Sequence, residues 1–205
     1  MSSPTLGALL IAIAYLAGSV PWGYLFGRWV GQIDLRQHGS GGTGATNALR
    51  TLGWRVSAAV LTLDFLKGFL PVFVANRLGL DGWWVAATGV AAVIGHCWSP
   101  FIGFRGGKGM ATGAGAAAGM FPAALLAVPV MIAIVAITRY VSLGSILGSV
   151  LVSGAVVGLA LAGRIHWSIP LAIVAMSAII VFQHQGNIRR LVSGTERRIG
   201  EHSAG

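Results

Sequence analysis

The stretch LGALLIAIAYLAGSVPWGYLFG, residues 6–27, decides the fold class of this chain. It carries no charged residue and is long enough to cross a bilayer as a helix. A second run, IPLAIVAMSAIIVF at 169–182, has the same character, and its continuous apolarity without alternation excludes a membrane β-barrel. Only 9% of the 205 residues are charged, whereas soluble domains carry about a quarter. The chain is therefore predicted to be an all-α polytopic membrane protein whose first apolar run, lacking a basic leader, stays uncleaved.

The number of membrane crossings depends on one segment. Apolar segments fall at 6–27, 56–78, 83–102, 110–137, 143–162 and 167–183. They make six helices if 110–137 is continuous, and seven if it breaks at GMFPAA (119–124), because Pro122 can begin a new helix. Basic residues gather on the cytoplasmic side of membrane proteins. Only the break places Arg139 and the tail arginines on the same side as the glycine-rich loops.

We therefore predict a single domain over residues 1–205 with seven transmembrane helices, the N-terminus outside and the C-terminus in the cytoplasm. The segment 110–120 would be only about 17 Å long, so we expect an interior helix that need not reach the far surface. Its small residues, like the GxxxG spacings at Gly144/Gly148 and Gly154/Gly158, predict close helix packing.

Four polar stretches stand out in this apolar chain, and the predicted topology places them all at the cytoplasmic face. They are GSGGTGATNALR (39–50), GFRGGKGMAT (103–112), RYVSLGS (139–145) and HQGNIRRLVSGTE (184–196). A charge bias explains the arginines and lysines behind the net charge of +9, but not the clustered Gly, Ser, Thr and Asn. The one-sided arrangement indicates a binding site.

The first stretch has the chemistry of a phosphate cradle. Glycines let backbone N–H groups point together into a concave nest, the hydroxyls add donors, and Arg50 adds a forked cation. No GxxxxGK[ST] pattern is present, and a flexible loop explains the stretch about equally well. The residues predicted to bind phosphate here are Ser40, Gly41, Gly42, Thr43, Gly44, Thr46 and Asn47.

The second stretch repeats this chemistry. Arg105 and Lys108 flank Gly106 and Gly107 just before residue 110, where a helix N-terminus would favour an anion. We expect two phosphate groups, or one ligand held from both sides. The carboxylates are scattered, so neither a metal nor another cofactor is predicted.

Several other residues have simpler interpretations. His96 and Cys97 are expected in the core, and Asp64 is expected to pair with Lys67 one helical turn away. His184 and Asn187 lie three positions apart and share a helix face.

Together the motifs resemble the acyl-phosphate:glycerol-3-phosphate acyltransferases, membrane enzymes of bacterial phospholipid synthesis. The resemblance extends from AYLAGSVPWGYL (14–25) through LDFLKGFLPV (63–72) to the tail. It implies transfer of an acyl group from acyl phosphate to the 1-hydroxyl of glycerol 3-phosphate, giving lysophosphatidate and phosphate. It also implies a multi-pass protein of the bacterial cell membrane with its site facing the cytoplasm. Acyl-CoA and nucleic acid are not expected as partners.

The resemblance also assigns residues. The positions that match the family's glycerol 3-phosphate site, and that we predict to be catalytic, are Lys108, Arg50, Ser145, His184 and Asn187. Gly106, Gly107 and Ser142 join the predicted phosphate-binding group. His184 is expected to orient a substrate as a hydrogen-bond donor rather than act as a base.

Three positions depart from the family pattern. Gly42 replaces the usual Asn, Gly186 replaces the usual acid, and Pro100 follows His96 at the fourth position instead of the third. The first and fourth of the polar stretches therefore lose polar side chains, and no side-chain role is assigned to positions 42 and 186.

Two other functions compete with an acyltransferase. A transporter for a phosphorylated solute would place its site near the midplane between repeated halves, and no internal repeat is evident. A structural or lipid-binding membrane protein leaves the ordered polar motifs unexplained. The acyl-CoA enzymes' NHxxxxD pattern is also missing, since Phe101 lies five positions beyond His96.

Overall fold

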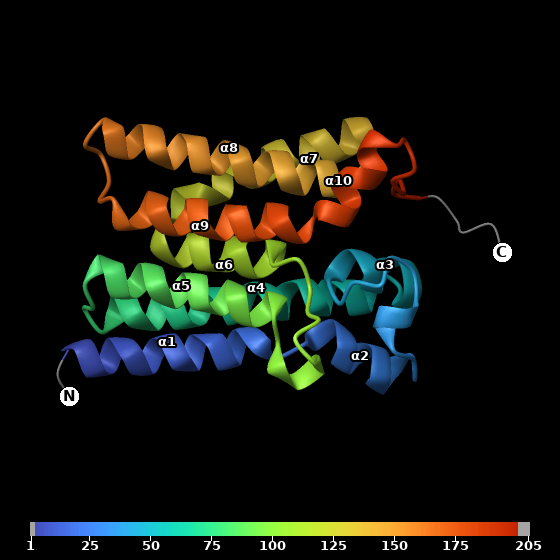
Figure 1. Cartoon of the computed structure of the whole chain (residues 1–205), viewed down its shortest axis with the longest axis horizontal. Helices are drawn as coiled ribbons and strands as arrows, with labels where there is room; N and C mark the ends of the chain where they lie inside the picture. Colours follow the sequence, from blue (N-terminus) through green and yellow to red (C-terminus); the bar gives the residue numbers. More distant parts are fainter. Residues whose placement is uncertain (1–2, 201–205) are drawn as a thin grey trace.

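The computed structural model describes residues 3–200, and within that range it contains helices and no strand (Figure 1). The α-helices are α1 (Ser3–Ser19), α2 (Trp22–Val30), α3 (Ala45–Leu52), α4 (Trp54–Arg77), α5 (Gly82–Cys97), α6 (Met110–Met120), α7 (Ala127–Thr138), α8 (Val141–Leu161), α9 (Ser168–Gln183) and α10 (Gln185–Val192). Three 3-10 turns connect them: η1 (Leu35–Gln37), η2 (Pro100–Ile102) and η3 (Pro122–Leu126).

The long helices pack side by side as one bundle. In Figure 1, α1, α5, α7 and α9 run toward the end that carries α2, α3 and α10, and α4, α6 and α8 run back. Within residues 3–200, four segments are long and apolar enough to cross a membrane: Ser3–Val30, Trp54–Arg77, Gly82–Ile102 and Val141–Leu161. The pair α9–α10, bent by 59°, makes a fifth if it counts as one span. The all-α membrane prediction is confirmed, and the count of seven crossings stays a prediction.

The expected break between α6 and α7 is present. α6 ends at Met120, Phe121 adopts an extended conformation (φ −151°, ψ 91°), and Pro122 begins η3. α6 has only 11 residues and is mostly buried. A Cβ at Gly115 would overlap the carbonyl oxygen of Phe65, so glycine is what allows the backbones of α4 and α6 to touch. The short interior helix is confirmed.

The first predicted span is wrong in one respect, because the helix does not continue through 6–27. α1 ends at Ser19 and α2 begins at Trp22, since Pro21 has no N–H to donate and restricts the residue before it. The carbonyls freed at the break find partners elsewhere. Lys67 Nζ lies 2.8 Å from the carbonyl oxygen of Val20, and Ser99 Oγ lies 2.6 Å from that of Ser19.

The two GxxxG spacings on α8 behave differently. A Cβ at Gly144 would lie 2.5 Å from Val135 Cγ2, and one at Gly148 would lie 3.3 Å from Met131 Cβ. Both neighbours belong to α7, so this pair of glycines lets α7 pack closely against α8. A Cβ at Gly154 or Gly158 would meet nothing within 4 Å. The packing prediction is therefore confirmed for the first pair and wrong for the second, which lies on an exposed stretch of the helix.

The four polar stretches gather at one end of the bundle, as the order of the helices requires (Figure 1). This end carries α2, η1, α3, the start of α8 and α10, and the loop from α5 to α6 opens toward it. The connections at 78–81 and 162–167 lie at the opposite end. Antiparallel passes thus bring together motifs that are far apart in the sequence.

Candidate functional site

A chain of partly buried polar side chains starts at Lys108, in the loop before α6. Lys108 Nζ donates a hydrogen bond of 2.5 Å to Asn187 Oδ1 on α10. Asn187 Nδ2 in turn donates to Glu196 Oε1 at 2.6 Å. Asn187 is only 5% exposed, so its amide joins Lys108 and Glu196 out of contact with bulk water.

Glu196 is the centre of this cluster, and the sequence prediction did not include it among the site residues. Ser142 Oγ, on the first turn of α8, donates to Glu196 Oε1 at 2.8 Å, and Arg190 Nε donates to Oε2 at 2.7 Å. Burial acts to raise the pKa of Glu196, but the hydrogen bonds from Asn187, Ser142 and Arg190 lower it overall, which keeps the carboxylate charged. Its position in the stretch 184–196 was the only signal available from the sequence.

The ammonium group of Lys108 sits in an electrostatically unusual place. Burial lowers its pKa to about 8, and the attraction of Glu196 offsets this only in part because Arg190 and Arg50 oppose it. Three cations thus surround one carboxylate. An anionic ligand would add the missing negative charge and stabilise the charged form of Lys108.

His184 lies at the junction of α9 and α10 and is 3% exposed. Its Nδ1 lies 2.7 Å from the carbonyl oxygen of Ile180, which can only accept, so Nδ1 carries the proton. Burial, followed by the charge of Lys108, lowers its pKa to about 4. The imidazole is therefore neutral at pH 7, with Nε2 as an acceptor. This revises the expected donor role, because the only ring N–H of the neutral form is used by the backbone.

The segment after α10 folds back across the polar end. Arg139 Nη2 donates to the carbonyl oxygen of Ile199 at 2.7 Å, and Ile199 N donates to that of Arg139 at 2.8 Å. On the other side, Arg50 Nη2 lies 3.4 Å from the carbonyl oxygen of Arg197. These contacts hold Glu196 inside the cluster and place Arg50, at the end of α3, beside it.

The first glycine-rich stretch is organised from within by Asn47. Its Nδ2 lies within 3.0 Å of the carbonyl oxygens of Leu35, His38 and Gly42, and its Oδ1 accepts from Ser40 N at 2.8 Å. Asn47 is 2% exposed. The side chain therefore shapes the loop and has no donor left for a ligand, which corrects its expected role as a phosphate ligand.

The other predicted residues of this stretch differ in exposure. Ser40 and Gly41 are exposed, Gly42, Gly44 and Thr46 are half-buried, and Thr43 is buried. The stretch connects to the Lys108 cluster through Arg50, at the far end of α3.

The second glycine-rich stretch serves packing more than anion binding. Gly106 N and Gly107 N each donate, at 3.1 Å, to the carbonyl oxygens of Cys97 and His96. A Cβ at Gly106 would overlap the carbonyl oxygen of His96, and one at Gly107 would overlap its imidazole Nε2. These two N–H groups are therefore not directed at a ligand, contrary to expectation. Arg105 is exposed, so only Lys108 of this stretch enters the cluster.

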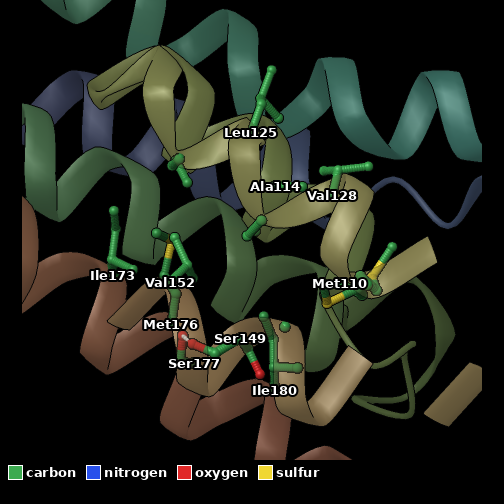
Figure 2. Close-up of a pocket in the computed structure, with 16 residues that line it drawn as sticks. Met110, Ala114, Leu125, Val128, Ser149, Val152, Ile173, Met176, Ser177 and Ile180 are labelled. Atoms are coloured by element: carbon green, nitrogen blue, oxygen red, sulfur yellow. Dashed lines mark hydrogen bonds between the residues drawn. The ribbon is translucent and has the colours of Figure 1, made fainter. Parts of the chain in front are cut away.

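An apolar pocket lies next to the polar cluster, between α6, α7, α8 and α9 (Figure 2). Its cavity volume is about 50 Å³. Met110, two residues after Lys108, and Ile180, whose carbonyl binds His184, line one side, and Figure 2 shows Ile173 on the side away from Met110. From Ile180 to Ile173 the wall runs about 10 Å along α9. A polar group at Lys108 and an apolar tail in the pocket would fit the same molecule.

Ser145 and Ser149 lie on the part of α8 that leads from the polar cluster to the pocket. Ser145 lies one turn after Ser142, is 5% exposed, and donates to the carbonyl oxygen of Val141 at 3.0 Å. Ser149, another turn further, lines the pocket beside Ser177 of α9, whose Oγ lies 3.0 Å from the carbonyl oxygen of Ser149 (Figure 2).

Known proteins match this chain over nearly its whole length. A family model described as glycerol-3-phosphate acyltransferase matches residues 8–194. A glycerol-3-phosphate acyltransferase of Halalkalibacterium halodurans is 44% identical over 203 residues, covering 95% of this chain and 96% of that protein.

Two solved structures are also similar over nearly the whole chain. Both are crystal structures of PlsY (YgiH), an integral membrane glycerol 3-phosphate acyltransferase. The glycerol 3-phosphate form has a TM-score of 0.87 and 38% identity, and covers 95% of this chain and 96% of that one. The lysophosphatidic acid form has a TM-score of 0.85 and 37% identity, and covers 95% of each chain.

Proposed function

Because the chain belongs to the glycerol-3-phosphate acyltransferase family, we propose that it transfers the acyl group of an acyl phosphate to the 1-hydroxyl of glycerol 3-phosphate. The products are lysophosphatidate and inorganic phosphate, and the reaction is the first step of bacterial phospholipid synthesis. The observation that carries this proposal is a half-buried Lys108, among Arg50 and Arg190, two residues from Met110 in the lining of an apolar pocket. The relatives crystallised in glycerol 3-phosphate and lysophosphatidic acid forms support the same acceptor and product.

The reaction needs positioning and charge neutralisation more than a protein nucleophile. The hydroxyl oxygen of glycerol 3-phosphate attacks the acyl carbonyl carbon, the bond from that carbon to the phosphate oxygen breaks, and the departing phosphate takes up the hydroxyl proton. Lys108 and Arg50 hold the phosphate of glycerol 3-phosphate, and Nε2 of His184 accepts a hydrogen bond from the attacking hydroxyl. Acyl phosphate is a mixed anhydride with a good leaving group, so orientation and electrostatics suffice.

The apolar pocket supplies a place for the acyl chain. Its lining is almost entirely aliphatic, and Met110 and Ile180 connect it to Lys108 and His184. A chain lying along α9 would bring its carbonyl group to the polar cluster and leave its tail between α6 and α8. The phosphate of the donor would then lie toward the glycine-rich stretch 39–44, with Ser40 and Thr46 as hydroxyl donors.

The identity of the acyl donor can be tested with the purified protein in detergent micelles. With glycerol 3-phosphate present, palmitoyl phosphate is expected to give lysophosphatidate and equimolar inorganic phosphate, and palmitoyl-CoA is expected to give neither. Each substrate alone serves as the control for hydrolysis. Turnover of palmitoyl-CoA at a comparable rate, or release of phosphate without glycerol 3-phosphate, would refute the proposed reaction.

The same proposal places the polar end in the cytoplasm, with seven crossings and the N-terminus outside. Cys97, the single cysteine, is 1% exposed and should not react with a membrane-impermeant thiol reagent. In intact cells, that reagent is expected to label Arg164→Cys, on the connection from α8 to α9, and to spare Gly200→Cys until the membrane is permeabilised. Labelling of Gly200→Cys in intact cells would restore the six-helix count.

A further inference from the structure

A buried ion pair in α4 lies outside the cluster described above. Lys67 Nζ and Asp64 Oδ1 are 2.8 Å apart, and their side chains are 6% and 3% exposed. Charged groups inside a membrane bundle are costly to bury, and where they occur they usually serve function. Among residues 3–200, neither side chain forms a hydrogen bond or ion pair with Lys108, so any effect of the pair on Lys108 must run through another residue.

His96, near the end of α5, is that residue. Its Nδ1 lies 3.7 Å from Asp64 Oδ1 and shares a hydrogen bond of 3.2 Å with Thr112 Oγ1. His96 is 7% exposed and Thr112 is completely buried. The imidazole is thus held on its Nδ1 side by the first turn of α6, with the Asp64 carboxylate of α4 close by.

The opposite side of His96 faces the loop that carries Lys108. Its Nε2 occupies the space that a Cβ at Gly107 would need, and its carbonyl oxygen accepts the N–H of Gly107 at 3.1 Å. His96 therefore holds the chain on both sides of Lys108, through Gly107 before it and Thr112 after it.

We propose that His96, held by Thr112 beside the Asp64–Lys67 pair, is a positioning residue that sets where the Lys108 ammonium stands in the glycerol 3-phosphate site. This inference rests on the proposed function, in which Lys108 binds the acceptor's phosphate. Substrate touches Lys108 and not His96. A displacement of the loop by about 1 Å would weaken acceptor binding, and such displacements can cost up to about 100-fold in rate.

A role limited to holding the fold makes a different prediction. If the contacts of His96 only stabilised the fold, removing them would lower the thermal stability and reduce turnover of both substrates together. A positioning role affects the site of one substrate, so the KM for glycerol 3-phosphate should rise while the KM for palmitoyl phosphate stays nearly constant.

The first experiment compares two buried threonines. Thr112→Val removes the hydroxyl that contacts His96, and Thr88→Val removes an equally buried hydroxyl that donates only to the carbonyl of Trp84 within α5. We expect Thr112→Val to raise the KM for glycerol 3-phosphate about tenfold with kcat changed less than about threefold. Thr88→Val should match the wild type in both constants, and the two variants should have similar midpoints of thermal unfolding.

A double-mutant cycle then tests the contact itself. Gly107→Ala should lower kcat/KM for glycerol 3-phosphate by about 100-fold, because its methyl group displaces the loop from His96. In the His96→Ala background the methyl group has room, so the same change should cost about tenfold or less. Equal losses in both backgrounds would overturn the inference.

The outcomes separate this inference from the proposed function. If Lys108→Ala is inactive but Thr112→Val behaves like Thr88→Val, His96 does not position the loop and the inference fails alone. If Lys108→Ala keeps wild-type kinetics, Lys108 does not bind the acceptor and the proposed function fails with it. A rise in the KM for both substrates after Thr112→Val would assign the network to the fold, which also overturns the inference.

Discussion

Lys108→Ala is expected to lower kcat/KM for glycerol 3-phosphate by about two to three orders of magnitude. A hydrogen bond to a charged group is worth about 1.5–3 kcal/mol, and electrostatic contacts strengthen further where water is excluded. Lys108 is such a group, half-buried beside Asn187 and Glu196. The measurement is steady-state turnover of palmitoyl phosphate at several concentrations of glycerol 3-phosphate, with protein amounts matched.

Arg50→Ala should have a similar effect, and Arg50→Lys should restore only part of the activity because the two-pronged contact to phosphate is lost. Arg77→Ala is the control for removing a positive charge. Arg77 stacks on Phe73 at the opposite end of the bundle, so this variant should keep wild-type kinetics. Wild-type kinetics in Lys108→Ala as well would remove Lys108 from the site.

The pH dependence gives a second view of Lys108. Its pKa is lowered to about 8, so the charged form that binds phosphate prevails below that pH and is lost above it. The value of kcat/KM, which reports the free enzyme, should therefore fall as the pH rises past about 8. Lys108→Arg keeps its charge, so whatever activity it retains should not fall over that range.

His184→Ala is expected to lower kcat by about 100-fold, at the lower end of what a residue acting on a reacting proton contributes. Its neutral imidazole donates from Nδ1 to Ile180, which leaves Nε2 to accept a hydrogen bond from the attacking hydroxyl. His184→Gln offers an amide oxygen as an alternative acceptor and should retain more activity than His184→Ala. The measurement is kcat at saturating concentrations of both substrates.

The pH profile distinguishes orientation from base catalysis by His184. Because its pKa is lowered to about 4, His184 should not titrate near pH 6.5. Phosphate esters titrate near pH 6 themselves, so the wild type and His184→Gln must be compared directly. The same rise with pH is expected in both. If the rise is lost in His184→Gln and that variant is as inactive as His184→Ala, His184 acts as the base.

The sequence by itself determined the helical membrane fold, the break after Met120, and the gathering of the polar motifs at one end. Each of these follows from local chemistry. A long apolar run must satisfy its backbone hydrogen bonds within a helix, Pro122 begins a new turn, and antiparallel passes return every second connection to the same end. The Asp64–Lys67 pair was predictable for the same reason, because one helical turn separates the two residues.

Only the tertiary structure decided which polar residues form the cluster and which bind the backbone instead. Glu196 became the centre of the cluster because the tail folds back between Arg139 and Arg50, and no local pattern encodes that path. Gly106 and Gly107 donate to the end of α5, and Asn47 binds its own loop, which the composition of a phosphate cradle does not reveal. A sequence motif states which donors exist, but the packing of segments distant in the chain determines which of them the backbone has already used.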